Sequence, residues 1–306
     1  MKKWLSLLLV FCLSVGCQMP VTSNKGHILT DSLGHQATIP DNARVVALYG
    51  SYAQCWALAG GELVGVTEDA VTERGMVLNE NTQLVGSVKE PSLEVIVSLN
   101  PDYIIMSADL TQHLQLEESL RQMGIGYGYF RMDTFEDYAQ IMSDFCRVNG
   151  EEGRISYLVE EVRNNIQQSL SRVPEGDKPD VLLIRAYSTG MKAKRDDNLA
   201  GVILKELGCH NIADDDDSML EDLSMEEIIQ QDPDYIFVLT MGNEEKAKEY
   251  LTQAAEQNPA WSGLKAVKAG NYIFLPKELF HYKPNERWDE SYEYIANILY
   301  PERIGN

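Results

Sequence analysis

The sequence is short of cysteine, histidine and positive charge. Its 306 residues include five cysteines and five histidines, and 26 lysines and arginines stand against 47 aspartates and glutamates. Cys55, Cys146 and Cys209 lie far apart among apolar residues without Cys-x-x-Cys spacing, so neither a zinc site nor a disulfide framework is indicated. A formal net charge of −21 argues against nucleic-acid binding, because that function requires a positive surface.

The common catalytic motifs are also missing. The chain has no Gly-x-Ser-x-Gly, His-Glu-x-x-His or P-loop pattern, and no cysteine in a Cys-His nucleophile context. A receptor for bare manganese or zinc ions would need converging histidines or carboxylates, whereas the histidines are dispersed and His27 and His35 precede the first expected core strand. The consecutive acids at residues 214–217 lack the alternating ligands and the glycine of a calcium loop, so we interpret them as a solvated loop.

The first sixteen residues have the pattern of an export signal. Residues 1–16 combine two lysines, a short apolar run and small residues before Cys17, a pattern typical of a secretory signal peptide that is too short to remain as a membrane helix. Residues 13–17 (LSVGC) resemble a bacterial lipobox, although Ser14 stands where leucine is usual, and ordinary cleavage nearby is the alternative. We therefore expect a lipid on Cys17, residues 17–26 as a tether, and an extracytoplasmic protein anchored to the cell membrane.

Residues 151–172 divide the remaining chain into halves that carry the same pattern. Apolar residues three and four apart predict one amphipathic helix there, roughly 30 Å long at 1.5 Å per residue. Before it, residues 92–104 read SLEVIVSLNPDYI, and after it residues 224–236 read SMEEIIQQDPDYI. Each copy predicts a short helix, a proline turn and a buried strand, although such a corner could also recur by chance. We expect one lobe over residues 27–150 and another over 173–306.

Short apolar strands alternate with helical segments in both halves. In the first half the expected strands cover residues 45–48, 64–66, 84–85, 103–106 and 125–130, and in the second half they cover 181–184, 235–239 and 272–275. This alternation predicts largely parallel sheets that are covered by helices on both faces. The predicted fold class is therefore α/β, with two doubly wound lobes joined by one long helix.

Three expected strand ends carry side chains suited to a ligand. In open parallel sheets ligands bind beyond the carboxyl ends of the strands. A guanidinium can hold a carboxylate bidentately, and aromatic rings can stack on a conjugated ligand or on a cation. The candidate ligand-binding residues are Tyr49, Ser51, Tyr52, Arg185, Lys192, Lys194, His281, Tyr282, Arg287 and Trp288.

Each of these groups also has a purely structural interpretation. Tyr49 and Tyr52 suit an ordinary turn with tyrosines packed on the surface. The cations between residues 185 and 195 suit a solvated hairpin whose charge offsets nearby acids. His281 suits a hydrogen-bonded loop histidine as well as a metal ligand. The sequence alone leaves these alternatives open.

Together, these features resemble the substrate-binding lipoproteins of ABC importers for iron-siderophores, haem and cobalamin. The most specific pieces are residues 45–59 with 65–67, the two Glu … Pro-Asp-Tyr-Ile copies, and LFHYKPNERW at residues 279–288. The resemblance implies a monomer with two lobes bridged by a stiff helix, a shallow groove between them, and an ABC permease with its ATPase as partners. It further implies that one glutamate per lobe docks onto the permease, which places this role on Glu94 and Glu226. Exposed acids in a first helical turn also suit the helix dipole.

The resemblance leaves the ligand open and implies no resident cofactor. Cations in the groove favour an anionic chelate such as a ferric siderophore, His281 and the tyrosines keep haem open, and the aromatic residues also suit cobalamin. Two alternatives belong to other classes of protein. One is an enzyme that uses the same groove, and the other is a surface lipoprotein that senses or adheres without transport.

Overall fold

The first half of the chain folds around a five-stranded parallel sheet. The computed structural model describes residues 26–301 except 177, 216, 222 and 224. The sheet has the order β5-β4-β3-β6-β7, and its strands are β3 (Val45–Ala47), β4 (Leu63–Val66), β5 (Gln83–Leu84), β6 (Tyr103–Ser107) and β7 (Gly126–Phe130). Its helices are α1 (Gly50–Leu58), α2 (Asp69–Thr72), α3 (Leu93–Ser98), α4 (Thr111–Leu114), α5 (Glu117–Met123) and α6 (Phe135–Val148). An antiparallel hairpin of β1 (His27–Thr30) and β2 (Gln36–Ile39), which the sequence pattern did not predict, precedes the sheet.

The second half builds a comparable sheet. Four parallel strands have the order β10-β8-β11-β12, and β9 pairs antiparallel with β8. The strands are β8 (Asp180–Tyr187), β9 (Gly190–Lys194), β10 (His210–Asn211), β11 (Tyr235–Thr240) and β12 (Tyr272–Phe274). The helices are α8 (Leu199–Glu206), α9 (Ser218–Glu221), α10 (Met225–Gln231), α11 (Glu244–Leu251), α12 (Lys265–Ala269), α13 (Lys277–Phe280) and α14 (Trp288–Leu299), with short helical turns η3 (Ile212–Asp214), η4 (Thr252–Glu256), η5 (Trp261–Gly263) and η6 (Asn285–Arg287). The predicted α/β fold of two lobes is confirmed.

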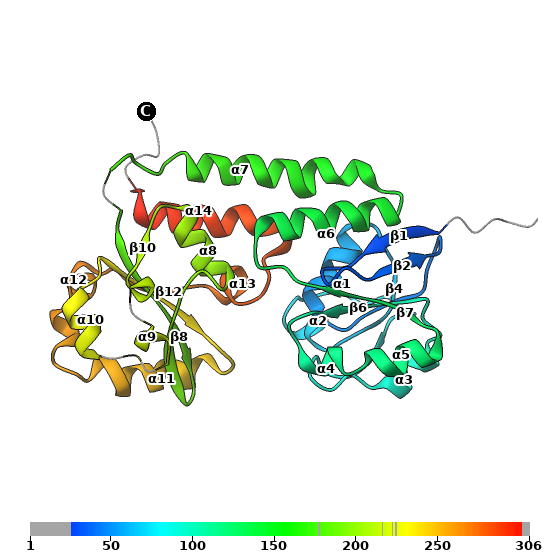
Figure 1. Ribbon diagram of the computed structural model, residues 1–306, viewed down its shortest axis with the longest axis horizontal. Helices are drawn as coiled ribbons and strands as arrows, with labels where there is room; N and C mark the ends of the chain where they lie inside the picture. Colours follow the sequence, from blue (N-terminus) through cyan, green and yellow to red (C-terminus); the bar gives the residue numbers. More distant parts are fainter. Residues whose placement is uncertain (1–25, 177, 216, 222, 224, 302–306) are drawn as a thin grey trace, which may run out of the picture.

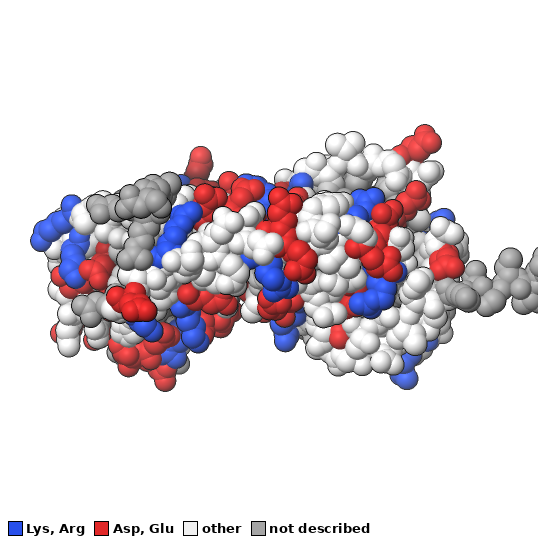
Figure 2. Space-filling model, turned by 90° about the horizontal axis from the view of Figure 1, so that it is seen from above, with Lys and Arg blue, Asp and Glu red and all other residues white. Residues whose placement is uncertain are grey.

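A helical connection crosses from one lobe to the other. It consists of a turn at η1 (Glu152–Arg154), a π-helical stretch at η2 (Ser156–Glu160) and α7 (Glu161–Leu170), so it is helical over most of the predicted span. Figure 1 shows α7 above both lobes, beside α6 and α14. On this face acidic and basic side chains are interspersed (Figure 2), and Arg163 of α7 pairs with Glu136 of α6. The bridge is therefore held to helices of both lobes.

The two sequence repeats have the same local structure. Asp102 accepts a hydrogen bond from the backbone N–H of Arg44 at 2.7 Å, and Asp234 accepts one from the backbone N–H of Asp180 at 3.0 Å. The residue two positions before each aspartate adopts a left-handed conformation, with φ of 46° and 43°. Each aspartate thus fastens the start of its own strand to the neighbouring strand, β3 or β8. The repeat marks one structural unit that is used in both lobes.

Each sheet has one face in an apolar core that the two lobes share. In β11, Phe237 and Leu239 lie in this shared core, whereas the intervening Val238 lies in a second core that belongs to the C-terminal lobe. In β3, Val45 belongs to the shared core and Val46 to a third core of the N-terminal lobe. The alternation follows from the two-residue period of a strand. The shared core therefore couples the inner faces of both sheets.

Helix α14 carries the largest side chain at the junction of the lobes. The indole of Trp288 is fully buried and lies edge-on to the ring of Phe135 of α6, with centroids 6.4 Å apart. Asn285, just before this helix, donates from Nδ2 to the backbone carbonyl of Ser51 at 3.0 Å and to Gln54 at 2.8 Å. These contacts fix the loop before α14 against the N-terminal lobe.

Candidate functional site

A groove of about 430 Å³ lies between the lobes, at the carboxyl ends of strands from both sheets. Its N-terminal wall follows β3, β6 and β7, and its C-terminal wall follows β8 and β11 and includes the end of α13. The lining residues are Tyr49, Ser107, Asp109, Leu110 and Asp133 on one side, and Arg185, Asp197, Asn198, Leu199, Leu239, Met241, Phe280, His281, Tyr282 and Lys283 on the other. Both repeats contribute, because Ser107 ends β6 and Met241 follows β11.

Four of the predicted ligand-binding residues line this groove. They come from three segments that are far apart in the sequence, and they are Tyr49, Arg185, His281 and Tyr282. The fold therefore brings together side chains from both lobes that the strand-end rule had selected.

Three other predicted residues are buried away from the groove. Ser51 is 3% exposed, and Tyr52 is fully buried with its hydroxyl donating to the backbone carbonyl of Phe130 at 2.8 Å. Trp288 belongs to the shared core. Because α1 already begins at Gly50, residues 51 and 52 turn inward with the helix, and the helical position of Trp288 does the same. These three predicted contacts are corrected accordingly.

The three remaining predicted cations do not line the groove. Lys192 is exposed on β9, opposite Arg185 in the strand pairing. Lys194 pairs with Asp197, and Arg287 forms two hydrogen bonds to Glu290 at 2.8 and 2.7 Å. Neighbouring acids already neutralise Lys194 and Arg287. For Lys194 this is what the structural interpretation of the hairpin expected.

Arg185 is the groove cation that has no acidic partner among the described residues. The other cation of the lining, Lys283, pairs with Asp133 at 2.9 Å. Arg185 has no ion pair within the described ranges, and its Nε is buried without a hydrogen-bond partner. A buried guanidinium nitrogen without a partner is unfavourable, so an acceptor on a bound ligand would be favourable at this position.

The acids of the groove are all paired. Asp109 is held by Arg131 at 2.7 Å, and Asp133 is held by Lys283. Burial acts against the ionisation of Asp197, but hydrogen bonds from Lys194 and Asn198 outweigh it and lower the pKa of this carboxyl group. Each acid of the lining thus has a basic partner other than Arg185, although the positive charge of Arg185 also helps to lower the pKa of Asp197.

A buried carboxylate holds Tyr49 at the groove. Asp69 accepts hydrogen bonds from the backbone N–H of Gly50 at 2.6 Å and from the hydroxyl of Thr67 at 2.5 Å, and so fixes the start of α1. A side chain at Gly50 would lie 2.7 Å from the backbone nitrogen of Ala70, so glycine is required there. Burial, followed by the nearby charge of Asp69, raises the pKa of Tyr49 to about 12. Tyr49 therefore presents a neutral phenol at neutral pH.

His281 supplies a neutral imidazole beside Arg185. Burial, reinforced by the positive charges of Lys277 and Arg185, lowers the pKa of His281 to about 4. Its ring lies against that of Tyr282, with centroids 4.9 Å apart. A neutral imidazole can accept a hydrogen bond or ligate a metal ion.

Several lining residues were missed by the sequence prediction. They are Ser107, Asp109, Leu110, Asp133, Asp197, Asn198, Leu199, Leu239, Met241, Phe280 and Lys283. A usable signal existed for some of them, because Ser107 and Met241 end the strands of the two repeats, to which the strand-end rule also applies. The same rule applied to Asp133, which lies just beyond the end of β7, whereas Asn198 follows a hairpin whose course the pattern does not define.

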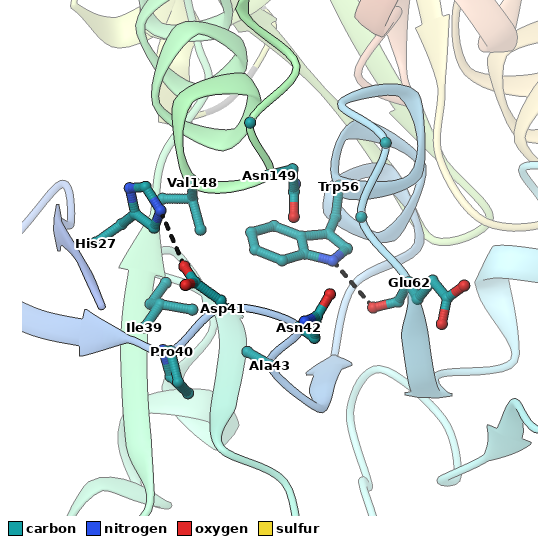
Figure 3. Close-up of a pocket in the computed structure, with 13 residues that line it drawn as sticks. His27, Ile39, Pro40, Asp41, Asn42, Ala43, Trp56, Glu62, Val148 and Asn149 are labelled. Carbon is teal, nitrogen blue, oxygen red and sulfur yellow. Dashed lines mark hydrogen bonds and ion pairs between the residues drawn. The ribbon is translucent and has the colours of Figure 1, made fainter. Parts of the chain in front are cut away.

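A second cavity of about 390 Å³ lies within the N-terminal lobe (Figure 3). Its walls come from the start of β1, the segment after β2 and the ends of α1 and α6. Its polar groups are partly paired with each other, with His27 Nε2 3.2 Å from Asp41 and the indole N–H of Trp56 donating to the Glu62 carbonyl at 3.1 Å. None of the predicted ligand-binding residues lines it.

The proposed docking glutamates lie on corresponding helices of the two lobes. Glu94 is exposed in the first turn of α3, and Glu226 is exposed in the first turn of α10. Neither forms an ion pair with any residue that the structure describes. The lipidation candidate Cys17, the expected signal and most of the tether lie outside the described residues.

The described residues contain neither a membrane-spanning helix nor a metal-binding cluster. In residues 26–301, apart from the four gaps, no helix has the length and apolar character needed to cross a membrane. Over the same ranges no three His, Cys, Asp or Glu side chains converge in a way that could hold a metal ion. The acidic run interpreted as a solvated loop contributes Asp214 and Asp217 to ion pairs with Arg195 at 3.5 and 2.7 Å.

Two α/β lobes, a helical bridge and a groove at opposed strand ends define a two-lobed solute-binding protein. The chain belongs to the periplasmic binding protein family, whose model matches residues 45–279. Members of this family bind solutes and are not enzymes, so the resemblance seen in the sequence is confirmed at the level of the family and the enzyme alternative is removed.

Known relatives cover most of the chain. The Fe(3+)-citrate-binding protein YfmC of Bacillus subtilis is 25% identical over 279 residues, which cover 87% of this chain and 86% of the relative. Among solved structures, an ABC transporter substrate-binding protein from Listeria monocytogenes has a TM-score of 0.69 at 18% identity, covering 85% of this chain and 99% of that one. Staphylococcus aureus IsdE complexed with heme also has a TM-score of 0.69 at 18% identity, covering 84% and 99%. These structures support the fold.

The low pKa of His281 predicts an acid-sensitive contribution to stability. Its pKa is about 4 in the folded protein and 6.5 in an unfolded chain, so the stabilisation by the neutral imidazole is complete above 6.5 and is lost as the pH falls toward 4. We expect His281→Gln to lose less unfolding free energy than the wild type between pH 7 and pH 4.5 in urea titrations.

His210→Gln is the matched control with the opposite sign. A hydrogen bond to Asp180 raises the pKa of His210, so this side chain stabilises the fold below about 6.5 and its removal should increase the loss on acidification. An acid-induced loss in His281→Gln as large as that of the wild type would contradict the burial of a neutral imidazole in the groove.

Proposed function

We propose that this chain is the substrate-binding lipoprotein of an ABC importer, which captures an anionic ferric chelate in the groove and delivers it to the permease. The observation that carries the proposal is Arg185, a partly buried guanidinium in the groove with an unsatisfied nitrogen and no carboxylate partner in the described chain. A carboxylate or similar oxyanion of the ligand would satisfy it with charge-assisted hydrogen bonds.

The remaining groove residues suit such a ligand. Tyr49 and Tyr282 supply aromatic surface and neutral phenol donors, one from each lobe. His281 supplies a neutral acceptor beside the guanidinium. The relative from Bacillus subtilis that covers most of this chain is named for binding ferric citrate, a chelate whose ligand carries carboxylates. We therefore place a carboxylate-rich ferric chelate first.

Haem is the second candidate. The neutral imidazole of His281 could coordinate the iron, and Arg185 could bind a propionate. The structural neighbour IsdE was solved with heme, although its 18% identity supports the fold alone. Haemin bound through an imidazole would show an intense, shifted Soret absorption that disappears in His281→Ala, whereas a ferric carboxylate would not. Cobalamin serves as a third probe in the same titrations.

The role of Arg185 predicts a selective loss of affinity. We expect Arg185→Met to weaken ferric citrate binding roughly ten- to a hundredfold, because a charge-assisted hydrogen bond contributes about 1.5–3 kcal/mol. Isothermal titration of the purified protein measures the change. Lys192→Met is the matched control, because Lys192 is the exposed cross-strand neighbour of Arg185 and lies outside the groove. Equal affinities in the two variants would remove Arg185 from the site.

Delivery is proposed to depend on Glu94 and Glu226, which would present the loaded protein to cations of the permease. We expect the double variant Glu94→Ala, Glu226→Ala to abolish importer-dependent uptake of the bound chelate while its affinity in solution stays unchanged. Glu80→Ala, Glu245→Ala is the control, because it removes two other exposed acids, again one from each lobe. Normal uptake by the first variant would remove the docking role from Glu94 and Glu226. Uptake that does not depend on the wild-type protein would favour the alternative in which the protein senses or adheres without transport.

Membrane attachment is proposed to depend on Cys17, whose place in the sequence resembles a lipobox. We expect labelled palmitate to be incorporated into the wild-type protein and not into Cys17→Ser, which should be released from the membrane fraction. Cys12→Ser, within the expected signal peptide, is the control and should remain labelled. Equal labelling of the Cys17→Ser variant would show that the lipid is attached elsewhere, and an unlabelled wild type would indicate ordinary signal cleavage.

A further inference from the structure

His113 is a fully buried histidine that does not line the groove. It lies in α4, and its Nδ1 accepts a hydrogen bond from the backbone N–H of Ser107 at 2.9 Å. Its Nε2 lies 2.9 Å from the backbone carbonyl of Val88. Because the amide of Ser107 can only donate, Nδ1 carries no proton, and Nε2–H donates to Val88. Burial lowers the pKa of His113, which keeps this neutral tautomer at neutral pH.

One of the two hydrogen-bond partners of His113 lies in the groove. Ser107 ends β6 and lines the groove, and its hydroxyl accepts a hydrogen bond from the backbone N–H of Asp109 at 3.2 Å. Asp109 also lines the groove. A ligand that contacts Ser107 or Asp109 therefore acts on the backbone that His113 holds.

The other partner, Val88, lies in the loop of residues 86–91, which leads directly into α3. Ser92 caps this helix by accepting from the backbone N–H of Val95, and Glu94 is exposed in its first turn. Figure 1 places α3 and α4 together at the edge of the lobe that faces away from α7. The imidazole thus lies between the groove and the start of the helix that carries Glu94.

Backbone contacts join the two ends of this loop. The backbone N–H of Ser92 donates to the carbonyl of Val85 at 2.7 Å, and Gly86 forms a bridge with Pro91. Gly86 has φ of 102°, and a side chain there would lie 2.6 Å from the carbonyl oxygen of Glu90. These contacts tie the loop that contains Val88 to Ser92, the residue that caps α3.

We propose that His113 is a positioning residue that couples occupancy of the groove to the loop of residues 86–91 and so to the start of α3. The proposal rests on the function proposed above for the groove and for Glu94. The rigid ring holds an acceptor for Ser107 on one side and a donor for Val88 on the other, so a shift of either backbone segment is felt by the other. Ligand binding at the groove thereby changes how firmly the loop and the first turn of α3 are held.

Two substitutions separate the two hydrogen bonds. His113→Asn places an amide oxygen near the position of Nδ1, where it can accept the hydrogen bond from Ser107, but its side chain is too short to reach Val88. His113→Gln places an amide N–H near the position of Nε2, where it can donate to the carbonyl of Val88, and loses the acceptor for the N–H of Ser107. His35→Gln is the control, because His35 is a hydrogen-bonded histidine of the same lobe that contacts neither the groove nor this loop.

The test is amide hydrogen exchange of the full mature protein, without ligand and with saturating ferric citrate or haemin, whichever raises its melting temperature. We expect the ligand to slow exchange in residues 86–95 about threefold or more in the wild type and in His35→Gln. In His113→Asn and His113→Gln this ligand-dependent change should disappear, although both variants still bind the ligand. A purely structural role would speed exchange in the free variants and leave the ligand-dependent change intact, which would overturn the proposal.

The same experiment separates failure of the coupling from failure of the proposed function. If ferric citrate or haemin binds and residues 86–95 of the wild type do not respond, the coupling is wrong and the binding function stands. If neither probe binds, the proposed ligand class is wrong, and the coupling is overturned with it, because there is then no ligand-dependent change for His113 to transmit.

Discussion

The structure depends on a single apolar core that runs from one lobe into the other. Alternate residues of the central strands enter it from both sheets, as Phe237 of β11 and Val45 of β3 do, and helices α6, α7 and α14 cover it. Trp288 and Phe135 meet across the junction. Because separating the lobes would expose this core to water, we expect the width of the groove between the strand ends to change little. Ligand binding then needs side-chain adjustment more than closure of two independent domains.

The charged side chains of the groove belong to this shared frame. The acids of the lining have partners within this frame, as Asp133 pairs with Lys283 of the other lobe and Asp109 pairs with Arg131. Arg185 alone among the lining cations of the described chain lacks an acid, and this is the feature that a ligand anion would complete. A protein with a strongly negative net charge can therefore still offer a favourable site to an anion, because recognition depends on the local field and not on the total.

The sequence predicted the architecture well because the fold follows from periodicity, which a linear pattern records. It placed Tyr49 and Arg185 at the groove through the strand-end rule, but it also placed Tyr52 and Trp288 there, and both lie inside the shared core. Each error is a question of which way a helical residue points, and a shift of one position decides it. His113 could not be found at all, since its two partners are backbone groups of other segments.

The central claim is that the lobes are one cooperative unit joined through the shared core. Differential scanning calorimetry of the ligand-free mature protein tests this most directly. The account predicts one transition whose calorimetric and van't Hoff enthalpies agree, because neither sheet can keep its inner face buried once the other unfolds. Two separate transitions, or a van't Hoff enthalpy well below the calorimetric one, would show that the lobes unfold independently and would contradict a groove of fixed width.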